Sequence, residues 1–167
     1  MGVRASKWFM LPFLTINEAN FWAVFMFQGT SLLVLDSKGR LSLPSRHRES
    51  FLLSKGAEVT LTRHPDGCVL LYPQSHWEEL SVKLMQLPYA LRAFQRMLLG
   101  SAVTVKIDAS GRLLVPSELR TLCGLSREVT FIGVGNHFEL WDQVRYSEYM
   151  DREMAKGLPQ ELESFTL

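Results

Sequence analysis

The sequence has little of what marks secreted, metal-binding or strongly charged proteins. Its two cysteines, Cys68 and Cys123, form no Cys-x-x-Cys or Cys-x-x-His pair, which argues against a disulfide framework and a zinc-finger spacing. We expect both to be small buried hydrophobic residues in a reducing compartment. The formal net charge of the 167 residues is +1, so the charge of the whole chain predicts no partner.

Signatures of catalysis are also missing from the sequence. The chain has no Gly-x-Ser-x-Gly elbow and no glycine-rich phosphate loop after a strand. Its histidines (His47, His64, His76 and His137) lack the spacing of metal ligands. His47, between Arg46 and Arg48, could touch a phosphate, but we favour a plain surface histidine. We therefore predict a protein that is not an enzyme and uses no metal or cofactor.

No apolar run is long enough to cross a membrane. Residues 8–14 are apolar but interrupted by Pro12, with no cleavage site after them, and residues 21–27 fall short of the roughly 20 residues that a membrane helix needs. The N-terminus also matches the short myristoylation pattern, to which we give little weight. We favour Met26 as the natural start and interpret residues 1–25 as an extension that is not natural sequence.

A thirteen-residue pattern occurs twice, and it is the most informative feature of the chain. The first copy runs from residue 36 to 48 and the second from 108 to 120. An internal repeat of this kind indicates two copies of one supersecondary unit. The identical pairs are Asp36 and Asp108, Gly39 and Gly111, Arg40 and Arg112, Leu41 and Leu113, Pro44 and Pro116, Ser45 and Ser117, and Arg48 and Arg120.

The two copies differ in charge. Copy one holds four basic residues against one acidic residue, a balance of +3, whereas copy two holds two of each and is neutral. Copy one is therefore the better candidate for binding an anion. Its basic residues are Lys38, Arg40, Arg46 and Arg48.

Hydrophobic periodicity and turn residues predict the order β-β-α-β-β-α twice, in an α+β, β-rich fold. Strands are expected at 30–35, 40–43, 57–63, 67–72, 101–107, 112–115, 128–133 and 137–141, and helices after 45 and at 75–87, 89–99, 117–123 and 142–155. Each copy is too short for its own core, so we expect one pseudo-symmetric body. The predicted division is an extension (1–25), repeat 1 (30–77), connecting helices (78–101), repeat 2 (102–145), and a C-terminal helix and tail (146–167).

The Asp-x-x-Gly-Arg segment permits two interpretations. The aspartate can accept backbone hydrogen bonds from the turn and hold the arginine four residues on, which would make the pair a lock for the turn. Alternatively, the arginine can read guanine in the major groove while neighbouring cations contact phosphates. We favour the turn lock for copy two and DNA contact for copy one. The residues expected to shape both turns are Asp36, Gly39, Pro44, Asp108, Gly111 and Pro116.

The doubled motif, the Phe27-Gln-Gly29 start and the Gln95–Gly100 helix end together resemble the MraZ family of bacterial transcriptional regulators, over about residues 26–150. The resemblance implies two SpoVT/AbrB-like units in an intrachain double-ψ, swapped-hairpin barrel. It implies closed homo-oligomeric rings in the cytoplasm, associated with the nucleoid, that bind double-stranded DNA at direct repeats upstream of their own division and cell-wall operon. The implied DNA contacts are Lys38, Arg40, Arg46, Arg48, Arg112 and Arg120, although Glu118 replaces the counterpart of Arg46.

A protein-interaction module is the main alternative. Aromatic residues are numerous, and although most should be core, some could seal contacts between subunits: Tyr72, Trp77, Trp141, Tyr146 and Tyr149. In that case the chain would be an oligomeric scaffold or antitoxin-like module with only non-specific affinity for DNA. Binding that falls steeply with salt would favour DNA as the partner.

Overall fold

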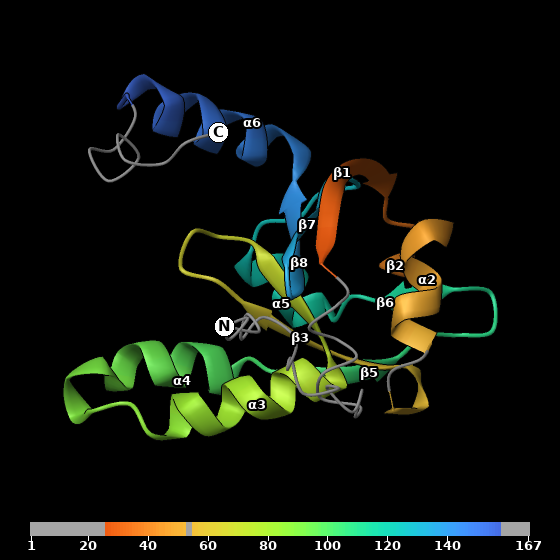
Figure 1. The fold of residues 1–167 in the computed structure, drawn as a ribbon. Helices are drawn as coiled ribbons and strands as arrows, with labels where there is room; N and C mark the ends of the chain where they lie inside the picture. Colours follow the sequence, from red (N-terminus) through yellow and green to blue (C-terminus); the bar gives the residue numbers. More distant parts are fainter. Residues whose placement is uncertain (1–25, 53–54, 158–167) are drawn as a thin grey trace, which may run out of the picture.

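The computed structural model describes residues 26–52 and 55–157, so the predictions for residues 1–25 and for the end of the tail lie outside it. The elements follow the predicted order (Figure 1). The first half contains β1 (Phe27–Val34), β2 (Arg40–Ser42), α2 (Ser45–Leu52), β3 (Glu58–Arg63), β4 (Val69–Pro73) and α3 (Gln74–Met85). The second half contains α4 (Arg92–Gly100), β5 (Val103–Lys106), β6 (Arg112–Leu114), α5 (Ser117–Leu122), β7 (Glu128–Gly135), β8 (His137–Asp142) and α6 (Gln143–Ala155).

The two halves exchange strands. The six-stranded sheet has the order β1-β7-β8-β4-β3-β5, so the first strand of each half pairs with a strand of the other half. β1 runs antiparallel to β7 over its full length, and β5 runs antiparallel to β3. These reciprocal pairings are those of swapped hairpins. The hydrogen-bonded order ends at β1 and β5, and the remaining strands, β2 and β6, pair with each other.

The β2–β6 ribbon is the centre of the pseudo-symmetry. Leu41 pairs with Leu113, Arg40 with Leu114, and Ser42 with Arg112. Both central leucines are fully buried, because alternate residues of a strand face opposite sides and this side faces the core. Backbone bonds extend the ribbon symmetrically at both ends, from Leu43 N to Gly111 O (3.0 Å) and from Val115 N to Gly39 O (2.9 Å).

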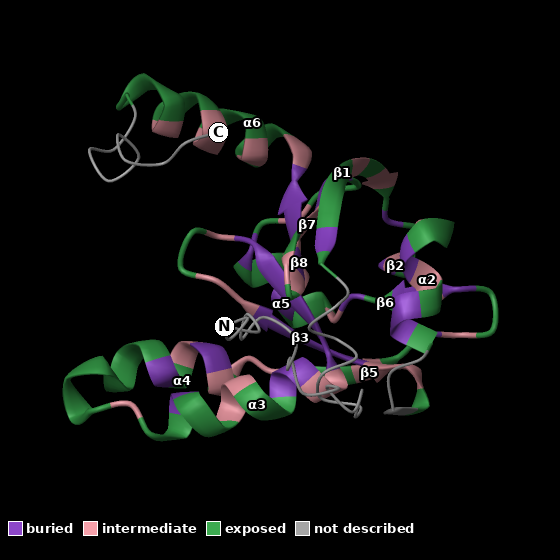
Figure 2. Cartoon of the chain, in the orientation of Figure 1, coloured by how far each residue is buried: buried purple, intermediate pink, exposed green. Residues whose placement is uncertain are grey.

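Two hydrophobic cores lie on the two faces of β4. Val69 and Leu71 belong to the larger core, which the strands of both halves and helices α2 and α5 enclose. Cys68, Leu70 and Tyr72 belong to a smaller core with Trp77 and Trp141, covered by helices α3, α4 and α6. Figure 2 shows the result: β3, β4 and β8 are mostly buried, whereas β1 and the outer surfaces of the helices are largely exposed. Burial on both faces explains why residues 69–72 are apolar without alternation.

The cysteines are buried as predicted. Cys68 is fully buried, and the Sγ of Cys123 donates to the Cys68 carbonyl oxygen at 3.2 Å. Burial raises the pKa of Cys123 to about 11 and raises that of Cys68 further. Both thiols therefore stay protonated and unreactive at neutral pH.

Helices α3 and α4 form a hairpin that projects from the strands (Figure 1). The side-chain nitrogen of Gln95 donates to the Leu84 carbonyl oxygen at 2.8 Å and ties the two helices together. The predicted continuous helix over 89–99 is wrong at its start, because a 3-10 turn (Tyr89–Leu91) precedes α4. No helix of the described ranges is long and apolar enough to cross a membrane.

The turn between the strands predicted at 128–133 and 137–141 is shorter than expected. β7 continues to Gly135, and Asn136 alone separates it from β8. The extension follows from pairing with β1, which places Gly133 opposite Gly29. A side chain at Gly133 would lie 2.5 Å from the backbone nitrogen of Gln28. Gly133 is therefore needed for close approach of two strands, not for a turn.

Candidate nucleic-acid interface

The turn between β1 and β2 is held by Asp36. Its Oδ1 accepts from the backbone nitrogens of Lys38 and Arg40, both at 2.9 Å. Its Oδ2 accepts from Arg40 Nε at 2.7 Å. These hydrogen bonds lower the pKa of Asp36 to about 2, and the bond from the backbone nitrogen of Arg40 has the largest effect. The carboxylate is therefore charged at neutral pH and fixes both the backbone of the turn and the direction of the arginine.

The turn between β5 and β6 repeats this arrangement. Asp108 Oδ1 accepts from the backbone nitrogens of Ser110 and Arg112, and Oδ2 accepts from Arg112 Nε at 2.8 Å. The pKa of Asp108 is lowered for the same reasons. The turn-lock interpretation is thus confirmed in both copies. It does not exclude DNA contact, because each aspartate engages only the Nε of its arginine and leaves the outer guanidinium nitrogens for a ligand.

The last arginine of each motif packs on the turn of the other half. Arg48 Nε donates to the Leu43 carbonyl oxygen at 2.8 Å, and a Cβ built on Gly111 would lie 2.5 Å from that nitrogen. Arg120 Nε donates to the Val115 carbonyl oxygen at 3.2 Å, and a Cβ on Gly39 would lie 2.6 Å from the Arg120 Cζ. Gly39 and Gly111 are thus needed for two reasons: each has a positive φ, and each leaves room for an arginine side chain from the other half. The identities are visible in the sequence, but this cross-packing is not, because each contact joins residues that are far apart in the chain: Gly39 with Arg120, and Gly111 with Arg48.

Arg40 and Arg112 lie on the same face of the ribbon. Leu41 and Leu113 point into the core, so the residues that alternate with them point outward. The register makes Arg40 and Arg112 diagonal neighbours, with Cα atoms about 7–8 Å apart by the usual sheet spacing. Exposed Ser42 and Leu114 complete this outward face. One surface thus carries an arginine from each half, and we call these four residues the ribbon face.

Lys38 and Arg46 distinguish the surroundings of the first arginine. Lys38 is exposed in the turn beside Arg40, where the second copy has Ser110. Arg46, at the start of α2, lies away from that turn, with its Nη2 donating to Ser31 Oγ at 2.8 Å. Ser31 precedes Asp36 by five residues, about 17 Å along an extended strand. The structure therefore brings Lys38 and Arg40 together at the first turn and places the positive charge of Arg46 at a separate position beside β1.

The prediction that His47 is a surface residue is wrong. The expected surface histidine is buried, with 8% of its surface exposed, and its ring packs edge-on against Phe138 at 4.8 Å between centroids. Its Nε2 accepts from Arg46 Nε at 2.9 Å. The available signal was the spacing of His47 and Phe51, because residues four apart lie on the same face of a helix and an aromatic residue such as Phe51 favours a buried face.

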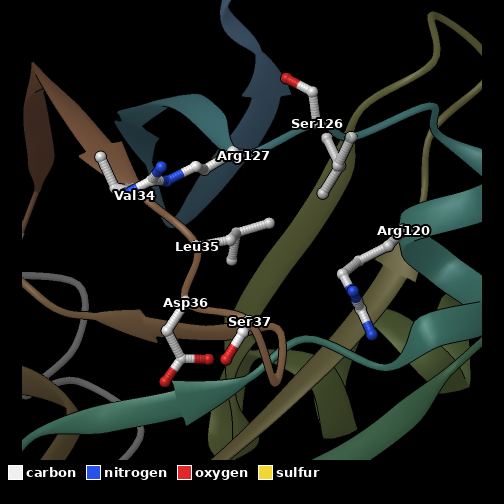
Figure 3. A pocket seen from close by; sticks show the side chains of 8 residues that line it. Val34, Leu35, Asp36, Ser37, Arg120, Ser126 and Arg127 are labelled. Carbon is white, nitrogen blue, oxygen red and sulfur yellow. The ribbon is translucent and has the colours of Figure 1, made fainter.

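A cavity of about 770 Å³ adjoins the first turn (Figure 3). Asp36 and Ser37 line it from the turn and Arg120 from α5, while the guanidinium of Arg127 points toward Val34. The cavity thus shares its wall with the basic turn. Among the described residues, no group of His, Cys, Asp and Glu has the arrangement of a metal site.

Comparison with known proteins places this geometry in a family. The sequence matches the family described as MraZ protein, antitoxin-like, once over residues 26–99 and again over 97–163. The chain belongs to the MraZ family. The double match coincides with the two halves that exchange strands around the ribbon, so the MraZ unit corresponds to one half of the structure.

Curated relatives share nearly half of the sequence. The chain is 47% identical over 141 residues to a protein of Bordetella pertussis named transcriptional regulator MraZ, covering 84% of this chain and 99% of that protein. It is 48% identical to a transcriptional regulator MraZ of Paraburkholderia xenovorans and 47% identical to one of Burkholderia mallei. Both matches also extend over 141 residues and cover 84% of this chain and 99% of the relative. These MraZ proteins are named as regulators of transcription.

Proposed function

We propose that this chain is a DNA-binding transcriptional regulator, with no catalytic role, that reads DNA with the ribbon face. The observation that carries the proposal is the placement of Arg40 and Arg112 on one two-stranded ribbon, each oriented by an aspartate. A two-stranded ribbon fits the major groove, which is about 12 Å wide, and arginine pairs with the O6 and N7 atoms of guanine. The names of the MraZ relatives agree with this function.

The basic residues divide into base-reading and phosphate-contacting groups. Arg40 and Arg112, held by Asp36 and Asp108, are the candidates for base contact, because an oriented side chain loses less entropy on binding. We assign phosphate contact to Lys38 and Arg46, and to the outer nitrogens of Arg48 and Arg120, which also support the turns. We further propose that Arg40 contributes more than Arg112, because Lys38 lies beside it and the second turn has no matching cation.

The target and the assembly belong to the same proposal. We propose that the chain forms a closed homo-oligomeric ring that binds direct repeats upstream of its own division and cell-wall operon, in the cytoplasm at the nucleoid. Subunits of a ring are related by rotation, which suits repeats in one orientation better than a palindrome. Exposed apolar side chains such as Leu32, Leu91 and Phe94 are available for contacts between subunits. Light scattering after size-exclusion chromatography gives the number of subunits, and a monomer at all concentrations would contradict the ring.

DNA recognition is tested by fluorescence anisotropy with a duplex from upstream of the gene and a shuffled duplex of equal composition. We expect preference for the upstream duplex, maintained as salt is raised from low to near-physiological concentration, while the absolute affinity falls. Equal binding to both duplexes that disappears with salt would support the alternative, an oligomeric or antitoxin-like interaction module.

A further inference from the structure

Arg46 is held by three hydrogen bonds, two to β1 and one to its neighbour His47 in α2. Its Nε donates to His47 Nε2 at 2.9 Å, and its Nη2 donates to Ser31 Oγ at 2.8 Å and, at 3.4 Å, to the Thr30 carbonyl oxygen. Its guanidinium lies over Gly29, where a Cβ would be 3.4 Å from Nη2. The side chain is nonetheless exposed, so it presents a fixed charge to solvent.

His47 can hold Arg46 in this way only as a neutral ring. An arginine Nε always carries a hydrogen, so the Nε2 of His47 must offer its lone pair, and the ring proton lies on Nδ1. The surroundings favour this form, because burial first and the charge of Arg46 second lower the pKa of His47. On the side of the sheet, the ring of His47 packs against the aromatic side chains of Phe131 in β7 and Phe138 in β8. The charged group beside the ring is Arg46.

Protonation of His47 removes the acceptor and sets two cations against each other. The Nε–H of Arg46 would then face an N–H of the imidazolium, so that this hydrogen bond is lost and repulsion replaces it. The second half of the chain has no such pair, because Glu118 and Leu119 occupy the equivalent positions. The device is therefore specific to the more basic half.

We propose that His47 is a positioning residue for Arg46, and that its protonation releases Arg46 from β1 and removes one phosphate contact from the DNA interface. The DNA part of this inference depends on the proposed function. The site lies about 17 Å along β1 from the first turn, so Arg46 would reach a phosphate outside the groove that the ribbon face enters. Acidification should then weaken DNA binding, although it adds positive charge to the protein.

The first arm of the test needs no DNA. Side-chain NMR of the full-length protein follows the Nε–H signal of Arg46, assigned with Arg46→Lys, and the ring signal of His47 from about pH 8 to about pH 5. We expect the Arg46 signal to shift and broaden with the same midpoint as the His47 ring. His47→Gln, whose side-chain oxygen can also accept, should keep the Arg46 signal constant over this range. Titration of His47 without any response of Arg46 would overturn the proposal.

The second arm measures the salt dependence of binding to the upstream duplex. In the wild type we expect the slope of log affinity against log salt to fall in magnitude by about 1 on acidification, the value for one phosphate contact. Arg46→Ala should show the reduced slope at every pH, and His47→Gln should keep the full slope. If Arg46 follows His47 by NMR but Arg46→Ala binds DNA like the wild type, positioning holds in the free protein and the DNA contact is wrong. A slope that increases on acidification would overturn the proposal, since His47 would then act as an added charge.

Discussion

At the scale of single residues, the repeated glycines and arginines act in pairs that cross the molecule. Gly39 makes room for Arg120, and Gly111 makes room for Arg48. Both turns therefore depend on a side chain supplied by the other half, which is distant in sequence but adjacent in space. This reciprocity explains why the shared pattern extends as far as the final arginine of each copy.

Replacing Gly111 by alanine should destabilise the protein by about 1–3 kcal/mol more than replacing Gly135. Both glycines have similar positive φ, +73° and +71°, so the backbone strain is matched. A Cβ at Gly111 collides with Arg48, whereas nothing lies within 4 Å of one at Gly135. Urea unfolding of the two variants measures the difference, and equal losses of stability would show that Arg48 moves aside freely.

Replacing Asp36 by asparagine should weaken specific DNA binding by about three- to tenfold with the fold retained. The amide oxygen can still accept from the backbone, but the charge-assisted bond to Arg40 Nε is lost. Anisotropy with the upstream duplex measures the effect, and circular dichroism checks the fold. Wild-type affinity in this variant would show that Asp36 does not orient Arg40 for binding.

The lock on the first turn should persist down to low pH. The pKa of Asp36 is about 2 in the folded protein, against an ordinary value of 3.8 for an aspartate. Because the pKa is lower in the folded protein than in the unfolded chain, the ionised Asp36 stabilises the folded state at any pH above the unfolded pKa. This contribution is lost as the pH falls from about 3.8 toward 2. Carboxyl-carbon NMR titration of Asp36 measures this directly. A midpoint near 3.8 would mean that the turn hydrogen bonds are not maintained in solution.

At the scale of elements, the β2–β6 ribbon joins the halves and carries the candidate site. Its short strands contribute Leu41 and Leu113 to the core on one side and Arg40 and Arg112 to the ribbon face on the other. The same alternation thus supports the fold and exposes the arginines. Anything that displaces the ribbon should affect stability and DNA binding together.

Leu41→Ala should lower the free energy of unfolding by about 2–5 kcal/mol, the range for a leucine removed from a packed core. Leu114→Ala, in the same ribbon, is the matched control, because Leu114 is 48% exposed whereas Leu41 is fully buried. It should change stability by about 0.5 kcal/mol or less. Chemical denaturation compares the two. Similar losses would indicate that the ribbon does not face the core.

Most elements could be predicted from the sequence, whereas their partners could not. Apolar alternation and turns such as 64–67 are local signals, and β3, β4 and α3 follow them closely. The pairing of β1 with β7 joins residues about a hundred positions apart and has no local signal, which is why the sequence predicts that this strand ends at residue 133 when β7 continues to Gly135. The basic residues of the site were identifiable from the duplicated motif, but the burial of His47 depends on Phe131 and Phe138 from distant strands.

At the scale of the whole molecule, strand exchange makes the halves one cooperative structure. The larger core contains residues from both halves, and neither half completes its sheet without the other. We therefore expect a single unfolding transition, with coincident curves from tryptophan fluorescence, which senses the smaller core through Trp77 and Trp141, and from circular dichroism. Two separated transitions would contradict this interdependence.

The measurement that tests the role of the ribbon face most directly is the specificity ratio of three proteins, the wild type, Arg40→Ala and Arg112→Ala. Each is titrated against the upstream and the shuffled duplex at one salt concentration, with fold and oligomeric state checked in parallel. Arg40→Ala should lose the preference for the upstream duplex while remaining folded and oligomeric, and Arg112→Ala should lose less affinity. Equal losses would contradict the predicted asymmetry between the two turns. An unchanged ratio in both variants would show that the ribbon face does not read DNA.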